Sequence, residues 1–164
     1  MASPLPHLIL LLLLVAVANG TPLVVQKLLG RRYSQPVDGD RRFVDGRPIF
    51  GRAKTLRGVA SAIVVTMAVA VIVGMGWQIG LLVGALAMTG DLFSSFLKRR
   101  LGRSSSSPIL GIDQIPESLF PLLACIYPLS LTIADVAVGV VIFFVAELAV
   151  SRLLYALDLR DPPY

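Results

Sequence analysis

The sequence has little charge and few of the residues that build disulfides or hydrolytic sites. Its 164 residues include one cysteine and one histidine, and only 15% are Asp, Glu, Lys or Arg. A lone cysteine excludes a disulfide scaffold, and a single histidine supports neither a zinc centre nor a hydrolytic triad. Soluble domains carry about 25% charged residues, so this composition is atypical of a soluble globule.

Hydrophobic residues are abundant instead, at 55% of the chain, and the mean hydropathy is +0.80. Such a composition excludes intrinsic disorder, and the length allows a single domain. The chain is therefore expected to be an all-α integral membrane protein, with residues 1–164 forming one membrane domain. The pI of about 9.9 indicates an anionic partner.

Five membrane-spanning helices are predicted, at about 5–25, 58–74, 77–97, 117–132 and 133–155. The uncharged stretch 58–90 would form a helix roughly 50 Å long, which is too long for one crossing of a ~30 Å hydrocarbon core. A turn is expected at 74–78, where two glycines precede an interfacial tryptophan.

The basic residues fall in three groups that alternate with these spans, so five crossings place all of them on one side. The positive-inside rule assigns that side to the cytoplasm. It predicts a multi-pass cell-membrane protein with its N-terminus outside, its C-terminus inside, and cytoplasmic loops at 26–57 and 98–116. The groups are Lys27, Arg31, Arg32, Arg41, Arg42, Arg47, Arg52, Lys54 and Arg57; Lys98, Arg99, Arg100 and Arg103; and Arg152 and Arg160.

Cleavage of the first span as a signal peptide is not expected, because residues 1–7 contain no Lys or Arg and the charge pattern requires that span. Within the third span, Gly76, Gly80 and Gly84 are spaced by four. This spacing is typical of a face that packs closely against a neighbouring helix.

Two acids lie at the cytoplasmic ends of the spans. Asp91, Ser95 and Lys98 occupy helical positions i, i+4 and i+7 and so share one face. They form either a solvated Asp91–Lys98 pair or part of a site at the cytoplasmic mouth. Asp113 precedes the fourth span and Glu117 is its first residue. Acids at these positions also suit an ordinary helix start, because they complement the helix dipole.

The first loop places Lys54, Thr55 and Arg57 directly before the second span. Backbone N–H groups at a helix N-terminus bind anions, but the Walker spacing is absent. A basic loop on anionic lipid head groups would explain the composition alone. Two basic segments flanking two acids at membrane depth also fit a triphosphate bound with a divalent ion.

Other polar residues carry weaker signals. Glu147 is expected to face the bundle, as a hydrogen-bonding residue or as part of an ion path. Asp135 and His7 are expected to be solvated. Residues 19–21 spell a glycosylation sequon, but they lie within a span and should be inert.

Three segments closely resemble the CDP-archaeol synthase family, which is related to the CDP-diacylglycerol synthases. The resemblance covers most of the chain and departs from the family pattern at Arg52 and Ala53, where an acidic or polar pair is expected. The segments are Gly51-Arg-Ala-Lys-Thr-Leu-Arg-Gly58, Thr89-Gly-Asp-Leu-Phe-Ser-Ser-Phe-Leu-Lys-Arg-Arg-Leu-Gly102 and Ile112-Asp-Gln-Ile-Pro-Glu117.

The resemblance implies that CTP reacts with digeranylgeranylglyceryl phosphate, giving a CDP-activated ether lipid and pyrophosphate. It implies Mg²⁺ held by Asp91 and Asp113, a catalytic role for Lys98, and no nucleic-acid partner. A lipid phosphate is largely dianionic at neutral pH and can attack without a protein base. The nucleotide- and phosphate-binding residues that it implies are Lys54, Thr55, Arg57, Gly58, Ser95, Lys98, Arg99, Arg100 and Gln114.

Three alternatives remain open from the sequence. A CDP-diacylglycerol-type synthase would use the same head-group chemistry on an ester lipid. A small transporter component would use Asp91 and Glu147 as an ion path. A non-catalytic membrane anchor would use only its basic loop, with binding that weakens steeply in salt.

Overall fold

The computed structural model describes residues 5–30, 32–103, 109 and 111–156, with side chains as far as residue 152. Five helices make up most of this part, and it contains no strand beyond two isolated bridges. The expected all-α fold is thus confirmed. Arg31, the serine run at 104–107 and Arg160 lie outside the described residues. The helices are α1 (Leu5–Leu29), α2 (Leu56–Ile72), α3 (Trp77–Arg100), α4 (Gln114–Ala124) and α5 (Ile133–Ala156).

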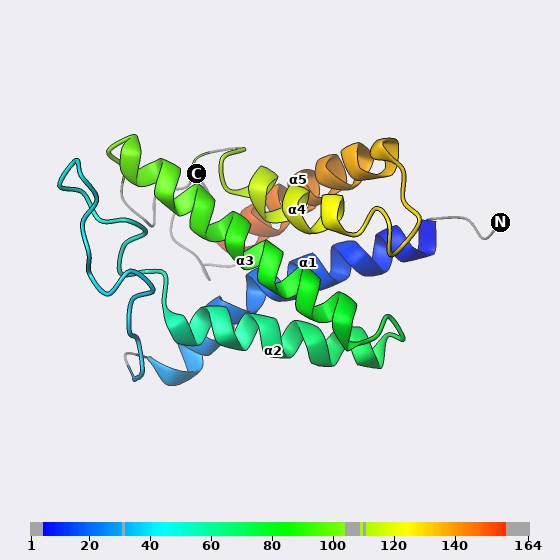
Figure 1. Cartoon of the computed structure of the whole chain (residues 1–164), viewed down its shortest axis with the longest axis horizontal. Helices are drawn as coiled ribbons and strands as arrows, with labels where there is room; N and C mark the ends of the chain where they lie inside the picture. Colours follow the sequence, from blue (N-terminus) through cyan, green and yellow to red (C-terminus); the bar gives the residue numbers. More distant parts are fainter. Residues whose placement is uncertain (1–4, 31, 104–108, 110, 157–164) are drawn as a thin grey trace.

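Three helices, α1, α3 and α5, are long and apolar enough to cross a membrane. The apolar α2 is shorter, with 17 residues, or about 26 Å at 1.5 Å per residue. The helices run back and forth along one long axis (Figure 1). The chain is a multi-pass membrane protein.

The expected turn between the second and third spans is present at 73–76. Gly74 and Gly76 have φ angles of 78° and 81°, a backbone region that costs glycine little and other residues more. This turn reverses the chain so that α3 returns along α2.

Glycines on α3 bring it into contact with α2, as their spacing predicted. A Cβ added at Gly80 would lie 2.5 Å from the Met67 Cα, and one at Gly84 would lie 3.0 Å from the Ile63 Cα. Larger residues would push the helices apart. The face predicted for close packing is therefore confirmed at these two positions.

The fourth helix differs from the expected span at 117–132, because α4 ends at Ala124 and turns follow. Its 11 residues cover about 17 Å, roughly half of a ~30 Å core. Pro128 lies in the turns and cannot supply a helical N–H donor. This segment is thus a short helix followed by irregular chain, and α4 is not among the helices long enough to cross a membrane.

The start of α4 is set into the side of α3. A Cβ at Gly90 would lie 2.3 Å from the Pro116 carbonyl oxygen, so only glycine allows this approach. Gly90 is ten residues before the end of α3 at Arg100, or about 15 Å along the helix. The N-terminus of α4 therefore lies at membrane depth, where irregular backbone is tolerated only if buried or lining a cavity.

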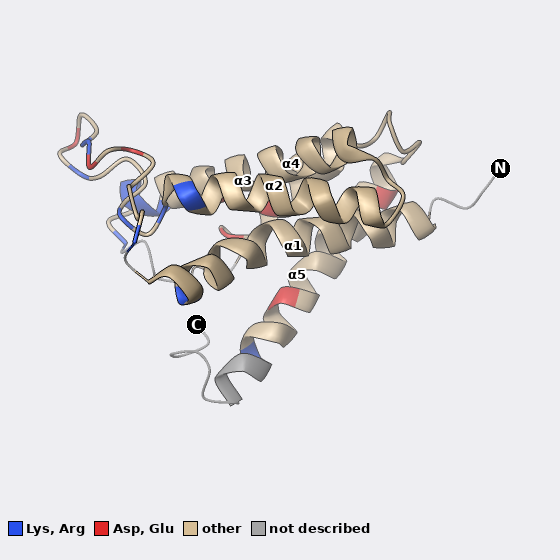
Figure 2. Ribbon diagram, turned by 90° about the horizontal axis from the view of Figure 1, so that it is seen from below, with Lys and Arg blue, Asp and Glu red and all other residues tan. Residues whose placement is uncertain are grey.

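The last helix begins with a reciprocal cap. The Thr132 hydroxyl accepts from the Asp135 N–H at 3.1 Å, and the Asp135 carboxylate accepts from the Thr132 N–H at 2.8 Å. Gly139 packs near Leu8 of α1. Beyond this contact α5 diverges from α1 (Figure 2), and most of its span is not covered by protein.

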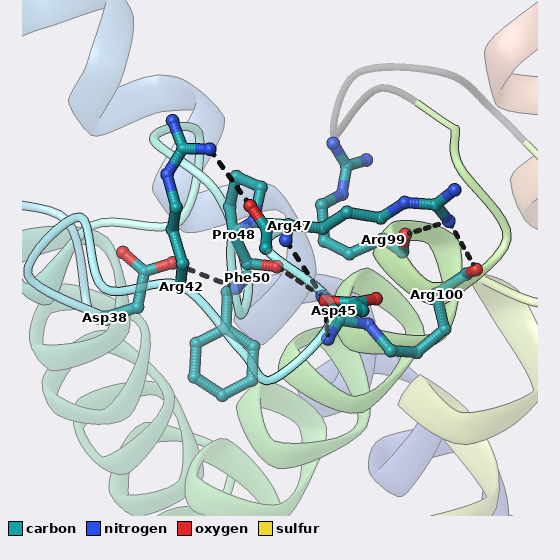
Figure 3. A network of polar contacts seen from close by, with 9 residues as sticks. Asp38, Arg42, Asp45, Arg47, Pro48, Phe50, Arg99 and Arg100 are labelled. Atoms are coloured by element: carbon teal, nitrogen blue, oxygen red, sulfur yellow. Dashed lines mark hydrogen bonds and ion pairs between the residues drawn. The ribbon is translucent and has the colours of Figure 1, made fainter.

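The loop between α1 and α2 is organised around the buried Asp38. Its carboxylate accepts from the backbone N–H of Phe50 at 2.9 Å (Figure 3). It also accepts from the backbone N–H groups of Gly51 at 2.9 Å and Asp40 at 3.1 Å. Burial raises the pKa of this carboxyl, but these hydrogen bonds outweigh it, so the pKa lies below its ordinary value. Asp38 thus holds the chain just before Lys54 in a fixed conformation.

The same loop docks on the C-terminal end of α3. The Arg47 guanidinium donates to the carbonyl oxygens of Arg99 at 3.2 Å and Arg100 at 2.7 Å (Figure 3). A cation at this end satisfies carbonyls that the helix leaves free and complements its dipole. Lys and Arg residues gather at this end of the molecule (Figure 2).

Candidate active site

A cavity of about 590 Å³ lies where the five helices meet near the basic end. Every helix contributes to its wall, together with the loop that precedes α2. It brings together seven of the residues predicted from the sequence: Lys54, Thr55, Arg57, Gly58, Asp91, Lys98 and Asp113.

Lys54 and Asp91 form the first of two ion pairs in the cavity. The Lys54 Nζ lies 2.5 Å from the Asp91 Oδ1, and both side chains are about four-fifths buried, at 21% and 18% exposed. Lys54 comes from the loop before α2, and Asp91 comes from α3. The pair therefore joins the basic loop to a span at membrane depth.

Lys98 and Asp113 form the second pair, with the Lys98 Nζ 2.8 Å from the Asp113 Oδ1. Lys98 is almost fully buried, at 6% side-chain exposure. Asp113 occupies the N-cap position of α4 without any capping hydrogen bond from its side chain. The ordinary helix-start explanation therefore does not account for this carboxylate, which points to Lys98 instead.

The shared face of Asp91, Ser95 and Lys98 is only partly as expected. Asp91 and Lys98 both line the cavity, but each forms an ion pair with a residue of another segment. Ser95 is fully buried, does not line the cavity, and its hydroxyl hydrogen-bonds to no described residue.

The start of α2 forms another part of the wall. The Thr55 hydroxyl caps the helix by accepting from the Gly58 N–H at 3.2 Å. The Arg57 guanidinium donates to the carbonyl oxygens of Arg32 and Gly30, which ties the end of α1 to this wall. Gly58 packs against Pro22 of α1: a Cβ added at Gly58 would lie 3.4 Å from the Pro22 Cβ. These residues thus shape the cavity as well as lining it.

Four predicted phosphate-binding residues lie outside the cavity: Ser95, Arg99, Arg100 and Gln114. Gln114 is buried and accepts from the Gly111 N–H at 2.8 Å, which orders the turn before α4. Arg99 is 8% exposed, and its Nε and Nη2 hydrogen-bond to no described residue.

Arg100 is committed to the loop that docks on α3. Its guanidinium pairs with Asp45 at 2.9 Å and donates to the Pro48 carbonyl oxygen at 2.6 Å. It also lies over the rings of Phe43 and Phe96, 4.7 and 4.9 Å from their centroids. This arrangement makes Arg100 a structural anchor for the basic loop.

Sequence reasoning left two cavity acids, Glu117 and Glu147, out of the predicted site. Glu117 is 7% exposed; its carboxyl hydrogen-bonds to Asp91 and lies within electrostatic range of Glu147 and Lys54. Both acids stand in apolar segments, where an ionisable residue marks a functional site by default. That signal was available from the sequence.

Asn19 was also missed, because its sequon was interpreted as inert. It lines the cavity from α1, and both polar atoms of its side chain are buried. A polar residue within an apolar span was the available signal.

The charge in the cavity is suited to a metal–phosphate ligand. Among the described residues, four acids and four basic residues line it: Asp91, Asp113, Glu117 and Glu147, and Arg52, Lys54, Arg57 and Lys98. No three acids, cysteines or histidines of the described part are arranged to hold a metal ion unaided. Mg²⁺ is commonly bound by one or two carboxylates together with substrate phosphates, and the donors present fit that mode.

A bundle of apolar helices that encloses paired lysines and carboxylates is the architecture of a membrane protein with a charged internal site, and such a site suits a phosphate ligand. Comparison with known proteins identifies the family. Residues 5–164 match the family model described as CarS-like, CDP-archaeol synthase. The chain belongs to the CDP-archaeol synthase family and is an enzyme, which confirms the resemblance seen in its sequence.

Individual relatives agree with this assignment. A CDP-archaeol synthase of Sulfurisphaera tokodaii is 33% identical over 90% of this chain and 89% of the relative. One of Pyrobaculum aerophilum is 31% identical over 90% and 92%. A solved structure described as "Structural insight into an intramembrane enzyme for archaeal membrane lipids biosynthesis" matches with a TM-score of 0.69 and 29% identity, covering 87% of this chain and 90% of the other.

Proposed function

We propose that this protein transfers the cytidylyl group of CTP to digeranylgeranylglyceryl phosphate in the cell membrane, making CDP-archaeol and pyrophosphate with Mg²⁺ as cofactor. The active site opens on the cytoplasmic side. The observation that carries the proposal is the convergence of Lys54, Asp91, Lys98 and Asp113 on one cavity. Family membership supports the reaction class.

The position of the cavity suits one soluble and one lipid substrate. Its basic residues come from the loop before α2 and from the last turns of α3, near the end where Lys and Arg gather. CTP reaches it from water at this end, and the lipid phosphate reaches it from the bilayer. By the positive-inside rule, the basic end faces the cytoplasm.

The reaction requires positioning and charge neutralisation more than proton transfer. An oxygen of the dianionic lipid phosphate attacks the α-phosphorus of CTP, a new P–O bond forms, and the bond to the β-phosphate oxygen breaks. Pyrophosphate leaves with the electron pair of that bond. No side chain needs to remove a proton, so the chemistry does not require a histidine in the cavity.

Lys54 and Lys98 are placed to exchange partners when the substrate arrives. In this structure each ammonium holds a carboxylate. When phosphates enter, the lysines would bind them and free Asp91 and Asp113, the two carboxylates that would hold Mg²⁺. Mg²⁺ supplies charge neutralisation on the phosphates, and the lysines stabilise the negative charge on the departing pyrophosphate.

The test is pyrophosphate release by the purified protein in detergent, with CTP and Mg²⁺, with and without digeranylgeranylglyceryl phosphate. Release should require the lipid and should stop with EDTA. A diacylglycerol phosphate arm measures selectivity for ether lipids, and a UTP arm measures selectivity for cytosine. No lipid-dependent release from folded protein with either lipid would contradict the proposal.

A further inference from the structure

Asn19 is a polar residue in the middle of the apolar helix α1, and its side-chain amide is unpaired within the part of the chain that the structure describes. Both Oδ1 and Nδ2 are buried, and neither hydrogen-bonds to any residue that the structure describes. An unsatisfied buried amide is costly to the folded state. On a cavity wall, such an amide indicates a group that binds a ligand.

The amide belongs to the face of α1 that lines the cavity. Asn19, Pro22, Leu23 and Gln26 are the α1 residues on the cavity wall. Their spacing of i, i+3, i+4 and i+7 describes one helical face. Asn19 therefore stands at the deep end of a continuous wall, and Gln26 stands at its outer end.

Asn19 lies deeper in the bilayer than the paired lysines and carboxylates. Its neighbour Ala18 is buried in a cluster with Ala62, Ala87 and Met88. Met88 also lines the cavity, and it precedes Asp91 on α3 by three residues, or about 4.5 Å. The cluster shared by Ala18 and Met88 places Asn19 about one helical turn from Asp91 on the side away from the basic end, and we call this part of the cavity its floor.

Given the proposed function, the positions of the basic residues around the cavity indicate which substrate binds near Asn19. Arg52, Lys54 and Arg57 come from the loop and the first turn of α2, on the outer side of the cavity. They favour pyrophosphate leaving toward water. Displacement at phosphorus places the attacking and leaving oxygens roughly in line, so the attacking lipid phosphate approaches from the opposite, deeper side.

The surroundings of the floor also favour a lipid. On one side the wall is formed by Leu23 of α1, which is 58% exposed. The other side includes Glu147 of α5, the helix that diverges from α1 (Figure 2). A prenylated glycerol can therefore keep its tails in the bilayer while its phosphate reaches the cavity.

We propose that the Asn19 amide binds the phosphate of the lipid substrate, with its Nδ2–H donating to a non-bridging oxygen, and holds the attacking oxygen beneath the α-phosphate of CTP. This inference rests on the proposed function and names a lipid-binding residue for it. A neutral donor orients the dianion without an added positive charge that would weaken the nucleophile.

Three variants test the assignment by steady-state kinetics in detergent. Asn19→Ala should raise KM for digeranylgeranylglyceryl phosphate about tenfold or more, as expected for a hydrogen bond to a charged group. Asn19→Asp should raise it further, because a carboxylate repels the phosphate. CTP binding, measured by calorimetry with Mg²⁺ and no lipid, should stay unchanged in both.

Asn19→Leu separates binding from folding. It removes the unsatisfied amide with a side chain of similar size, so Tm in detergent should hold or rise while KM for the lipid rises. Thr21→Val is the matched control on the same helix, because the Thr21 hydroxyl donates to the Val17 carbonyl oxygen at 2.7 Å and does not line the cavity. Its KM values should match those of the wild type.

Each outcome decides between explanations. A rise in KM or Kd for CTP with no change for the lipid would assign Asn19 to the nucleotide and overturn the inference. Unchanged kinetics in Asn19→Ala, with an active wild type, would make Asn19 a wall residue only. A wild type without lipid-dependent release would contradict the proposed function itself, which keeps the two failures distinct.

Discussion

Lys54 and Asp91 are 37 positions apart in the sequence, yet the Nζ of one lies 2.5 Å from the Oδ1 of the other. Buried ion pairs contribute little to stability, because desolvation offsets their attraction. A buried pair that links the loop before α2 to α3 inside the cavity therefore needs an explanation other than stability. The proposed function offers one, in which the two charges stay paired until a phosphate and a metal ion would separate them.

The proposed exchange requires both carboxylates, Asp91 and Asp113. Asp91→Asn and Asp113→Asn should each lower kcat by at least about a hundredfold, the size of effect seen when one charge-stabilising group is lost from an active site. Both variants keep the shape of the side chain, so they should remain folded. Pyrophosphate release, with Tm measured in the same detergent, checks this prediction.

A control is available at Asp45, whose carboxylate pairs with Arg100 at 2.9 Å outside the cavity. Asp45→Asn weakens one contact of the loop anchor and removes no cavity group, so it should lose much less turnover than Asp91→Asn or Asp113→Asn. Full activity in Asp91→Asn or Asp113→Asn would remove that residue from the metal site.

Lys98 is predicted to act on the transition state. Lys98→Ala should lower kcat/KM by about a hundredfold or more, because an almost fully buried ammonium beside the phosphates is worth more than an exposed one. It also leaves Asp113 without this cation, so stability must be followed in parallel. Lys27→Ala, at an exposed position on α1, is the matched control. A normal kcat/KM in Lys98→Ala would show that this charge serves the fold alone.

The sequence predicted the five helices and much of the site because both depend on local signals. Uncharged runs, a glycine-rich turn and the interval of four between Gly80 and Gly84 are visible without tertiary information. Lys54, Asp91, Lys98 and Asp113 stood out as charges next to apolar runs. Their common cavity confirms that they meet.

The pairing of these residues was not predictable from helical spacing. Periodicity places Asp91 with Lys98 on one face, but it says nothing about a loop residue such as Lys54 that approaches from outside the helix. The depth of α4 likewise depends on one tertiary contact, between Gly90 and Pro116. Arg100 matched a phosphate-binding pattern, and only the folded loop reveals its contacts with Asp45 and two aromatic rings.

Gly90 should therefore be sensitive to the smallest added side chain. Gly90→Ala places a Cβ 2.3 Å from the Pro116 carbonyl oxygen, so α4 must shift away from α3. Such overpacking typically costs about 1–3 kcal/mol, and the shift also moves Asp113 relative to Lys98. Both Tm and kcat should fall.

Gly20→Ala provides the contrast, since a Cβ there meets nothing within 4 Å. Gly20 is within α1, where alanine is favoured over glycine by about 0.5–1 kcal/mol. Its Tm should hold or rise. A Gly90→Ala protein as stable and active as Gly20→Ala would show that α4 is free to move without affecting the site.

Asp38 gives the loop a predicted dependence on pH. Its carboxyl has a lowered pKa in the folded protein, so the ionised form is favoured by folding. This stabilisation is fully present above the ordinary pKa of Asp, about 3.9, and is lost as the pH falls through the lower folded value. Hydrogen exchange at the N–H groups of Phe50 and Gly51 should therefore remain protected at pH 5 and lose protection only in stronger acid.

Asp38→Asn should expose the same two N–H groups at neutral pH, because a neutral amide oxygen accepts hydrogen bonds less strongly than a carboxylate. Since the loop carries Lys54, turnover should fall along with protection. If the Phe50 and Gly51 N–H groups lost their protection from exchange while kcat stayed normal, the ion pair with Asp91 would suffice to hold Lys54 in position. Loss of both would place the Asp38 turn among the elements that hold the active site together.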